Sequence, residues 1–149
     1  MSKAGPILSL VGGIISLLVT ILFRWTMYMW IFTDIIMQIA IGIITLLIYI
    51  FSFVSIVGGI LGINENKTGT TICIISGAIL ILCMTLDLAI WVLIQSIIET
   101  DDPRNRIYWL MFAIIRTIFG IIPSILVLVG GIVGKKAMQI DEKDSSYIY

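Results

Sequence analysis

Four long apolar segments, separated by short polar ones, dominate the pattern of hydrophobic and polar positions along this chain. A helix needs about 20 apolar residues to cross the hydrocarbon core of a bilayer. Each segment reaches that length, so the sequence predicts four transmembrane helices. We expect them over residues 5–23 (or as far as 32), 35–63, 71–98 and 107–134.

Polar residues mark the breaks between these segments. Residues 64–69 form a polar hairpin loop after the second segment, and residues 99–106 form another after the third. In the latter loop Asp102 is placed to cap a helix that begins at the following proline. The first break is the weakest, because only Thr33-Asp34 resembles a helix start.

Composition supports a lipid-solvated chain. Of its 149 residues, 60% are hydrophobic and 12% are charged, against about half and about a quarter in soluble domains. A soluble fold of this size has too much surface to hide so much apolar side chain. The first segment lacks a signal-peptide cleavage site and is expected to belong to the mature protein. We therefore predict an all-α integral membrane four-helix bundle.

Charge and motif content exclude several function classes. Net charge is zero, so no basic field points to nucleic acid. The chain has no His, which removes the commonest metal ligand and general base. No phosphate-binding glycine loop, nucleophile–base pair or metal-ligand spacing occurs. The sequence thus predicts a protein that is not an enzyme and needs no cofactor or metal.

Two weaker signals leave alternatives open. The acidic residues in loop 99–106 lack the ordered ligand pattern of a calcium site, and a solvated loop is the favoured interpretation. Cys73 and Cys83 are about 15 Å apart on a helix, too far for a disulfide. Cys73 lies near one membrane interface, where palmitoylation is an alternative to core packing.

Lysines near the helix ends predict the orientation, since cytoplasmic loops are enriched in Lys and Arg. Every lysine falls on one side of the predicted bundle and three arginines fall on the other, so both termini are expected in the cytoplasm. Asn66-Lys67-Thr68 is a glycosylation sequon, and its use would invert this topology. The lysines are Lys3, Lys67, Lys135, Lys136 and Lys143.

An internal repeat relates the two halves of the chain. Val-Gly-Gly-Ile occurs at 11–14, 57–60 and 129–132. Segment 57–62 also matches 129–134, and the first span aligns with the third, with Gly13 over Gly77. We interpret the protein as two tandem helical hairpins, about 5–63 and 69–134, that are parallel copies. Chance recurrence in isoleucine-rich helices is the alternative.

Small residues recur along one face of each predicted helix. In lipid, close packing over such residues holds helices together. The spacing of seven on the second helix favours left-handed crossings. A pore would more plausibly lie between subunits than within such a bundle. The predicted packing residues are Gly12, Gly13, Ser52, Gly59, Gly77, Gly120 and Gly131.

Asp87 and Arg116 are the charges that stand inside apolar segments. Each lies about 20 residues, or about 30 Å of helix, from the nearest cytoplasmic lysine, and Arg24 lies equally far from Lys3. All three are expected in one layer near the outer membrane edge, where they would form an ion network. Charges in a span need partners. We favour a network that pins the bundle together over an ion pathway or a substrate contact.

Beyond that layer each helix continues for about ten apolar and aromatic residues, or about 15 Å. Tilt, a thick membrane or truly intramembrane charges would explain this excess. We favour a bundle that projects outward and buries an aromatic cap against other subunits. The predicted outer aromatic cap comprises Trp25, Tyr28, Trp30, Trp91, Tyr108 and Trp109.

The repeated Gly-Gly-Ile, four spans and short charged tail resemble small four-helix membrane proteins of bacteria and archaea. That resemblance covers most of the chain and implies the fold, but it brings no assigned activity. The topology is similar to that of claudins and tetraspanins, yet the Trp–Cys–Cys and Cys-Cys-Gly signatures of those families are absent. No functional residue is carried over from them.

The sequence therefore predicts one transmembrane domain over 1–134 and a mobile, charged cytoplasmic tail over 135–149, whose end a partner could capture. The predicted role is structural: self-association, or assembly with other membrane-protein subunits in the cell membrane, through the outer aromatic cap. The alternative is a small oligomeric channel or transporter whose path passes Asp87 and Arg116 at subunit contacts.

Overall fold

The computed structural model describes residues 3–28, 35–97 and 103–145. This part of the chain contains four α-helices and no strand. Each helix includes a stretch long and apolar enough to cross a membrane, which confirms the predicted all-α four-helix membrane bundle. The helices are α1 (Ala4–Tyr28), α2 (Ile35–Ile63), α3 (Lys67–Ile97) and α4 (Pro103–Ser145).

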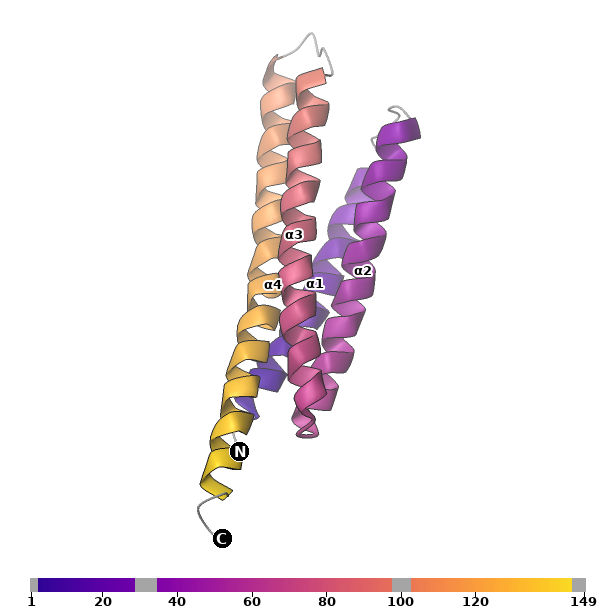
Figure 1. Cartoon of the computed structure of the whole chain (residues 1–149). Helices are drawn as coiled ribbons and strands as arrows, with labels where there is room; N and C mark the ends of the chain where they lie inside the picture. The colour runs from indigo at the N-terminus through magenta and orange to yellow at the C-terminus, as the bar shows by residue number, and fades with distance from the viewer. Residues whose placement is uncertain (1–2, 29–34, 98–102, 146–149) are drawn as a thin grey trace.

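The four helices form a ring. Each packs against its neighbour in chain order, and α4 closes the ring against α1, while the diagonal contact between α2 and α4 is slight. Figure 1 shows the start of α1, the loop between α2 and α3 and the end of α4 at the same end of the bundle. We call this the lysine end, because it carries Lys3, Lys67, Lys135, Lys136 and Lys143, and we call the opposite end the far end.

The turn between α2 and α3 is short because the C-terminal motif of α2 is followed directly by the N-cap of α3. Glu65 has a left-handed φ of 64°, and the N–H groups of Glu65 and Asn66 donate to carbonyls of the last turn of α2 at 3.1 Å. This is the Schellman pattern of a helix C-terminus. The side-chain Oδ1 of Asn66 then accepts the N–H of Thr68 at 2.9 Å. Since Asn66 caps α3, the helix starts at Lys67 rather than at the predicted residue 71.

Helix α4 runs past Gly134 as far as Ser145, where the sequence analysis predicted a mobile tail from residue 135. Residues 135–145 contain no Gly or Pro, and seven of these eleven residues are Lys, Ala, Met, Gln or Glu, which are good helix formers. The helix therefore propagates, and Met138 is buried. Residues 146–149, with their predicted capture by a partner, lie outside the described residues.

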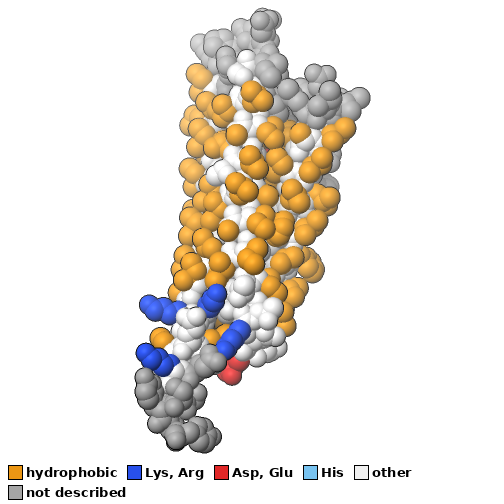
Figure 2. All heavy atoms as spheres, in the orientation of Figure 1, with side chains coloured by type: hydrophobic (Ala, Val, Ile, Leu, Met, Phe, Trp, Pro, Cys, Tyr) orange, Lys and Arg blue, Asp and Glu red, His pale blue; other side chains and the backbone are white. Residues whose placement is uncertain are grey.

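Burial in this bundle is inverted relative to a soluble protein. Large apolar side chains face outward, with Leu22 66% and Phe53 62% exposed, and Figure 2 shows them covering the visible face above the lysine end. Lipid solvates such side chains, so the helices pack over small residues instead. The molecule is an integral membrane protein. Its fully buried side chains include Ser9, Ser16, Ser52, Ser55, Ser76 and Ser124.

Candidate functional site: the buried ion pair and the small-residue contacts

The contact between α1 and α2 is built on glycines. A β-carbon at Gly13 would lie 3.2 Å from the backbone nitrogen of Ile56, and one at Gly59 would lie 2.9 Å from that of Leu10. A side chain at Gly59 would need its neighbours to shift, and one at Gly13 would be tighter than ordinary van der Waals contact, so these glycines allow the helix backbones to approach closely. Ser52 lies in the same contact, where its hydroxyl donates to Ser16 Oγ at 3.1 Å.

The contact between α3 and α4 uses the corresponding residues. A β-carbon at Gly77 would lie 2.7 Å from the backbone nitrogen of Leu128, and one at Gly131 would lie 2.9 Å from that of Ile74. Gly120 faces α3 differently, because its β-carbon would meet Met84 Sδ at 2.5 Å. On α1, a β-carbon at Gly12 would lie 2.7 Å from the carbonyl oxygen of Pro123 in α4. All seven predicted packing residues thus lie at helix contacts.

The two hairpins share one contact register. When Gly13 is aligned with Gly77, and Gly59 with Gly131, the helix contacts of one hairpin fall on equivalent positions of the other. The match extends to the contacts between hairpins, in which the Ser9 hydroxyl donates to Val127 O at 2.9 Å and the Cys73 thiol to Ser55 O at 3.7 Å. Matched pairs within the hairpins are Gly13–Ile56 with Gly77–Leu128, Gly59–Leu10 with Gly131–Ile74, and Gly62–Pro6 with Gly134–Thr70.

Sequence reasoning missed Gly130 and Gly69, two glycines in very tight contacts between the hairpins. A β-carbon at Gly130 would lie 2.5 Å from Ser9 Oγ and 2.6 Å from the carbonyl oxygen of Gly5. At the equivalent contact of α2 with α3, a β-carbon at Gly69 would lie 2.7 Å from the carbonyl oxygen of Gly58. The signal was present in Gly-Gly-Ile: the second glycine packs within its hairpin, and the first packs against the other hairpin.

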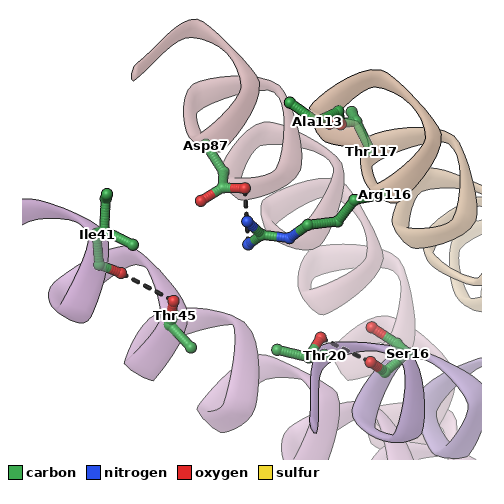
Figure 3. Close-up of polar contacts among 8 residues, drawn as sticks. All are labelled: Ser16, Thr20, Ile41, Thr45, Asp87, Ala113, Arg116 and Thr117. Atoms are coloured by element: carbon green, nitrogen blue, oxygen red, sulfur yellow. Dashed lines mark hydrogen bonds and ion pairs between the residues drawn. The ribbon is translucent and has the colours of Figure 1, made fainter. Parts of the chain in front are cut away.

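Asp87 of α3 and Arg116 of α4 form an ion pair inside the bundle. Arg116 NH2 lies 2.8 Å from Asp87 Oδ2, and the two side chains are 8% and 3% exposed. Figure 3 shows the Arg116 side chain reaching from α4 to Asp87, with Thr45 of α2 and Thr20 of α1 on the other side of the pair. The structure therefore brings together two of the three charges predicted to share a layer. The side chain of the third, Arg24, lies outside the described residues.

Buried threonines near the pair donate their hydroxyl protons to their own helices. Thr20 donates to Ser16 O at 2.7 Å, Thr45 to Ile41 O at 2.8 Å and Thr117 to Ala113 O at 2.8 Å. Each hydroxyl oxygen keeps lone pairs that can accept another hydrogen bond. The interior near Arg116 thus offers hydrogen-bond acceptors to a cation, although the surrounding helices bury this region. Thr20 and Thr45 belong to the small-residue faces of their helices, so helical periodicity in the sequence already indicated an interior position for both.

Trp91 is buried inside the chain rather than exposed in the outer aromatic cap to which the sequence analysis assigned it. Its side chain is 4% exposed and clusters with Ile41 and Ala113. The reason is angular: Trp91 lies one turn after Asp87, so both residues share the inward face of α3. Within the described residues, Trp91 Nε1 has no hydrogen-bond partner.

Of the other residues assigned to the outer aromatic cap, Tyr108 is 71% exposed. Its neighbours Ile107 and Met111 on α4 are also exposed, so this end of the helix presents an apolar surface. The side chains of Trp25, Tyr28 and Trp109 lie outside the described residues, as does Trp30.

Buried serines link α2 to α3, and we expect their contribution to be modest. The hydroxyl oxygens of Ser55 and Ser76 lie 2.8 Å apart. We expect Ser76→Ala to lower the free energy of unfolding by about 0.6 kcal/mol, the average for an interhelical hydrogen bond in a membrane protein. Ser96→Ala is the control, because within the described part of the chain exposed Ser96 bonds only to Leu93 O of its own helix. Unfolding by denaturing detergent in mixed micelles measures both; equal effects would contradict the assignment.

Comparisons of the chain with protein-family models, with curated proteins and with solved structures found no match.

Proposed function

We propose that this membrane protein is not an enzyme and acts as a structural or assembly component. In this proposal it associates with itself, or with other membrane-protein subunits, through the outer aromatic cap at the far end of the bundle. The pairing and burial of the interior charges is the observation that carries the proposal. The two charges best suited to a polar pathway are paired with each other at 2.8 Å and buried, and glycine contacts join all four adjacent helix pairs.

A buried ion pair of this kind is suited to holding helices in register. Removing one partner would leave an uncompensated charge in a low-dielectric interior, so the pair favours the arrangement that keeps both together. Asp87 and Arg116 come from α3 and α4 of one hairpin. Their aligned positions in the first hairpin are occupied by Phe23 and Ile44, so only the second hairpin carries this lock.

The exposed far end of α4 supports an assembly surface there. Ile107, Tyr108 and Met111 are 60%, 71% and 54% exposed, which gives a partner an apolar surface with an aromatic anchor. In the proposed topology this surface faces outward and the lysine end faces the cytoplasm. That orientation rests on the positive-inside tendency of lysines near helix ends.

The proposal includes an origin by duplication of a two-helix hairpin. Three pairs of glycine contacts within the hairpins fall on equivalent positions, and so do the Ser9–Val127 and Cys73–Ser55 hydrogen bonds between them. Chance recurrence of Gly-Gly-Ile would repeat the sequence motif but would not predict equivalent helix contacts. Two copies of such a hairpin would associate in the manner in which the halves of this chain now pack.

A small channel or transporter is the second candidate, and buried polar groups inside the bundle favour it. Asp87, Arg116, Thr20 and Thr45 are buried in the interior and lie in the same region of the bundle, and ionisable residues inside spans often mark ion or proton paths. A path past them would have to open between helices or between subunits.

Ion flux distinguishes the two candidates. We expect liposomes that contain the purified protein to release K⁺ and H⁺ at the rate of empty liposomes, because Asp87 and Arg116 are buried and paired with each other. Ser96→Ala, which alters an exposed residue, serves as a reconstitution control beside Asp87→Asn. Flux above background that Asp87→Asn abolishes and Ser96→Ala preserves would refute the structural role.

A further inference from the structure

Three lysines flank the crossing of α1 and α4 at the lysine end. The backbones of Gly5 and Gly134 touch there, since a β-carbon on Gly5 would overlap the backbone of Gly134. Lys3 precedes Gly5 by less than one helical turn, and Lys135 and Lys136 follow Gly134 directly. The crossing therefore brings lysines from distant parts of the sequence to the same corner of the bundle. We call Lys3, Lys135 and Lys136 the lysine corner.

The lysine corner lies at the edge of the lipid-facing surface. All three side chains are exposed, and within the described part of the chain none of them forms an ion pair. Directly beside them on α1 and α4, Ile7, Ile132 and Val133 are 48%, 50% and 44% exposed. Figure 2 shows the change from a hydrophobic surface to Lys and Arg side chains at this end. The ammonium groups thus stand where hydrocarbon gives way to lipid headgroups.

We propose that the lysine corner binds the headgroup of an anionic phospholipid. A phosphodiester beside the ends of α1 and α4 can accept hydrogen bonds from several ammonium groups, while its acyl chains lie against the exposed apolar side chains above. Three like charges at one corner of the bundle repel each other, and an anion near them relieves that repulsion. The negative phosphate complements the positive lysines. The adjoining apolar surface selects a lipid over a soluble phosphate.

Lipid binding to the purified, full-length protein tests this proposal. Native mass spectrometry in mild detergent counts bound phosphatidylglycerol and phosphatidylcholine during a titration. We expect the wild type to retain phosphatidylglycerol preferentially. Each lysine near an anionic surface contributes about fivefold in affinity, so Lys135→Gln with Lys136→Gln should weaken phosphatidylglycerol binding by about thirtyfold.

The matched control removes two lysines from the same end but outside the lysine corner, Lys67→Gln with Lys143→Gln. This variant has the same net charge as the test variant, and it should keep most of its preference for phosphatidylglycerol. Equal losses in the two variants would overturn a localised site, and so would a wild type that does not discriminate between the lipids. Displacement of the lipid by inorganic phosphate at the same concentration would also overturn the proposal, because it would show that the apolar surface plays no part.

Discussion

Asp87→Asn is expected to lower the free energy of unfolding by about 3–5 kcal/mol, the range found when one partner of a buried ion pair is removed. The substitution keeps the shape of the side chain but leaves the guanidinium of Arg116 buried without its counter-charge. Arg116→Gln should cost a similar amount, because it strands the carboxylate of Asp87. Unfolding by denaturing detergent in mixed micelles, followed by circular dichroism, measures both.

The double variant Asp87→Asn/Arg116→Gln decides whether the two charges act as a pair. If they do, the double variant will be much more stable than the sum of the single effects predicts, because no charge is left stranded in the interior. Additive losses would mean that each residue is held by separate partners, and the ion pair at 2.8 Å would then not lock α3 to α4.

Gly130→Ala is expected to destabilise the bundle by about 1–3 kcal/mol, the usual range for overpacking of a core. The added methyl group would lie 2.6 Å from the carbonyl oxygen of Gly5, and a backbone atom cannot rotate away as a side chain can. α1 and α4 would therefore have to separate. The same unfolding assay in mixed micelles measures the loss.

Gly42→Ala is the matched control, since a β-carbon at Gly42 would meet nothing within 4 Å. It should be neutral, or stabilising by up to about 1 kcal/mol through helix propensity. Gly58→Ala repeats the test at the equivalent contact of the other hairpin, where Cys73 Sγ and Ile72 Cγ2 each lie 2.9 Å from the added β-carbon. Equal effects of Gly130→Ala and Gly42→Ala would show that the close approach of the helices contributes nothing to stability.

The sequence contained enough information for the four spans and for the glycine contacts within each hairpin. Apolar length defines a membrane helix almost by itself, and a glycine in such a helix has few uses other than close packing. Helix length counted from the lysines also placed Asp87 and Arg116 at one depth, and they lie together in the structure. Left-handed crossing remains a prediction.

Features that depend on angular position or on local capping could not be predicted in the same way. Trp91 was assigned by the general preference of tryptophan for interfaces, but its place one turn after Asp87 turns it inward. Asn66 was considered as a glycosylation site, and its role as the cap of α3 depends on the backbone of Glu65. Helix α4 extends past Gly134 because nothing in 135–145 breaks it.

Assembly through the far end is the central claim, and site-specific photo-cross-linking in the native membrane tests it most directly. A photoreactive phenylalanine analogue in place of Tyr108, which is 71% exposed at the far end, should form adducts with protein, either a second copy or another subunit. The same analogue in place of Phe53, which is 62% exposed on α2, should react only with lipid. Protein adducts at 108 and none at 53 are the predicted result. Lipid adducts alone at both positions would contradict the account.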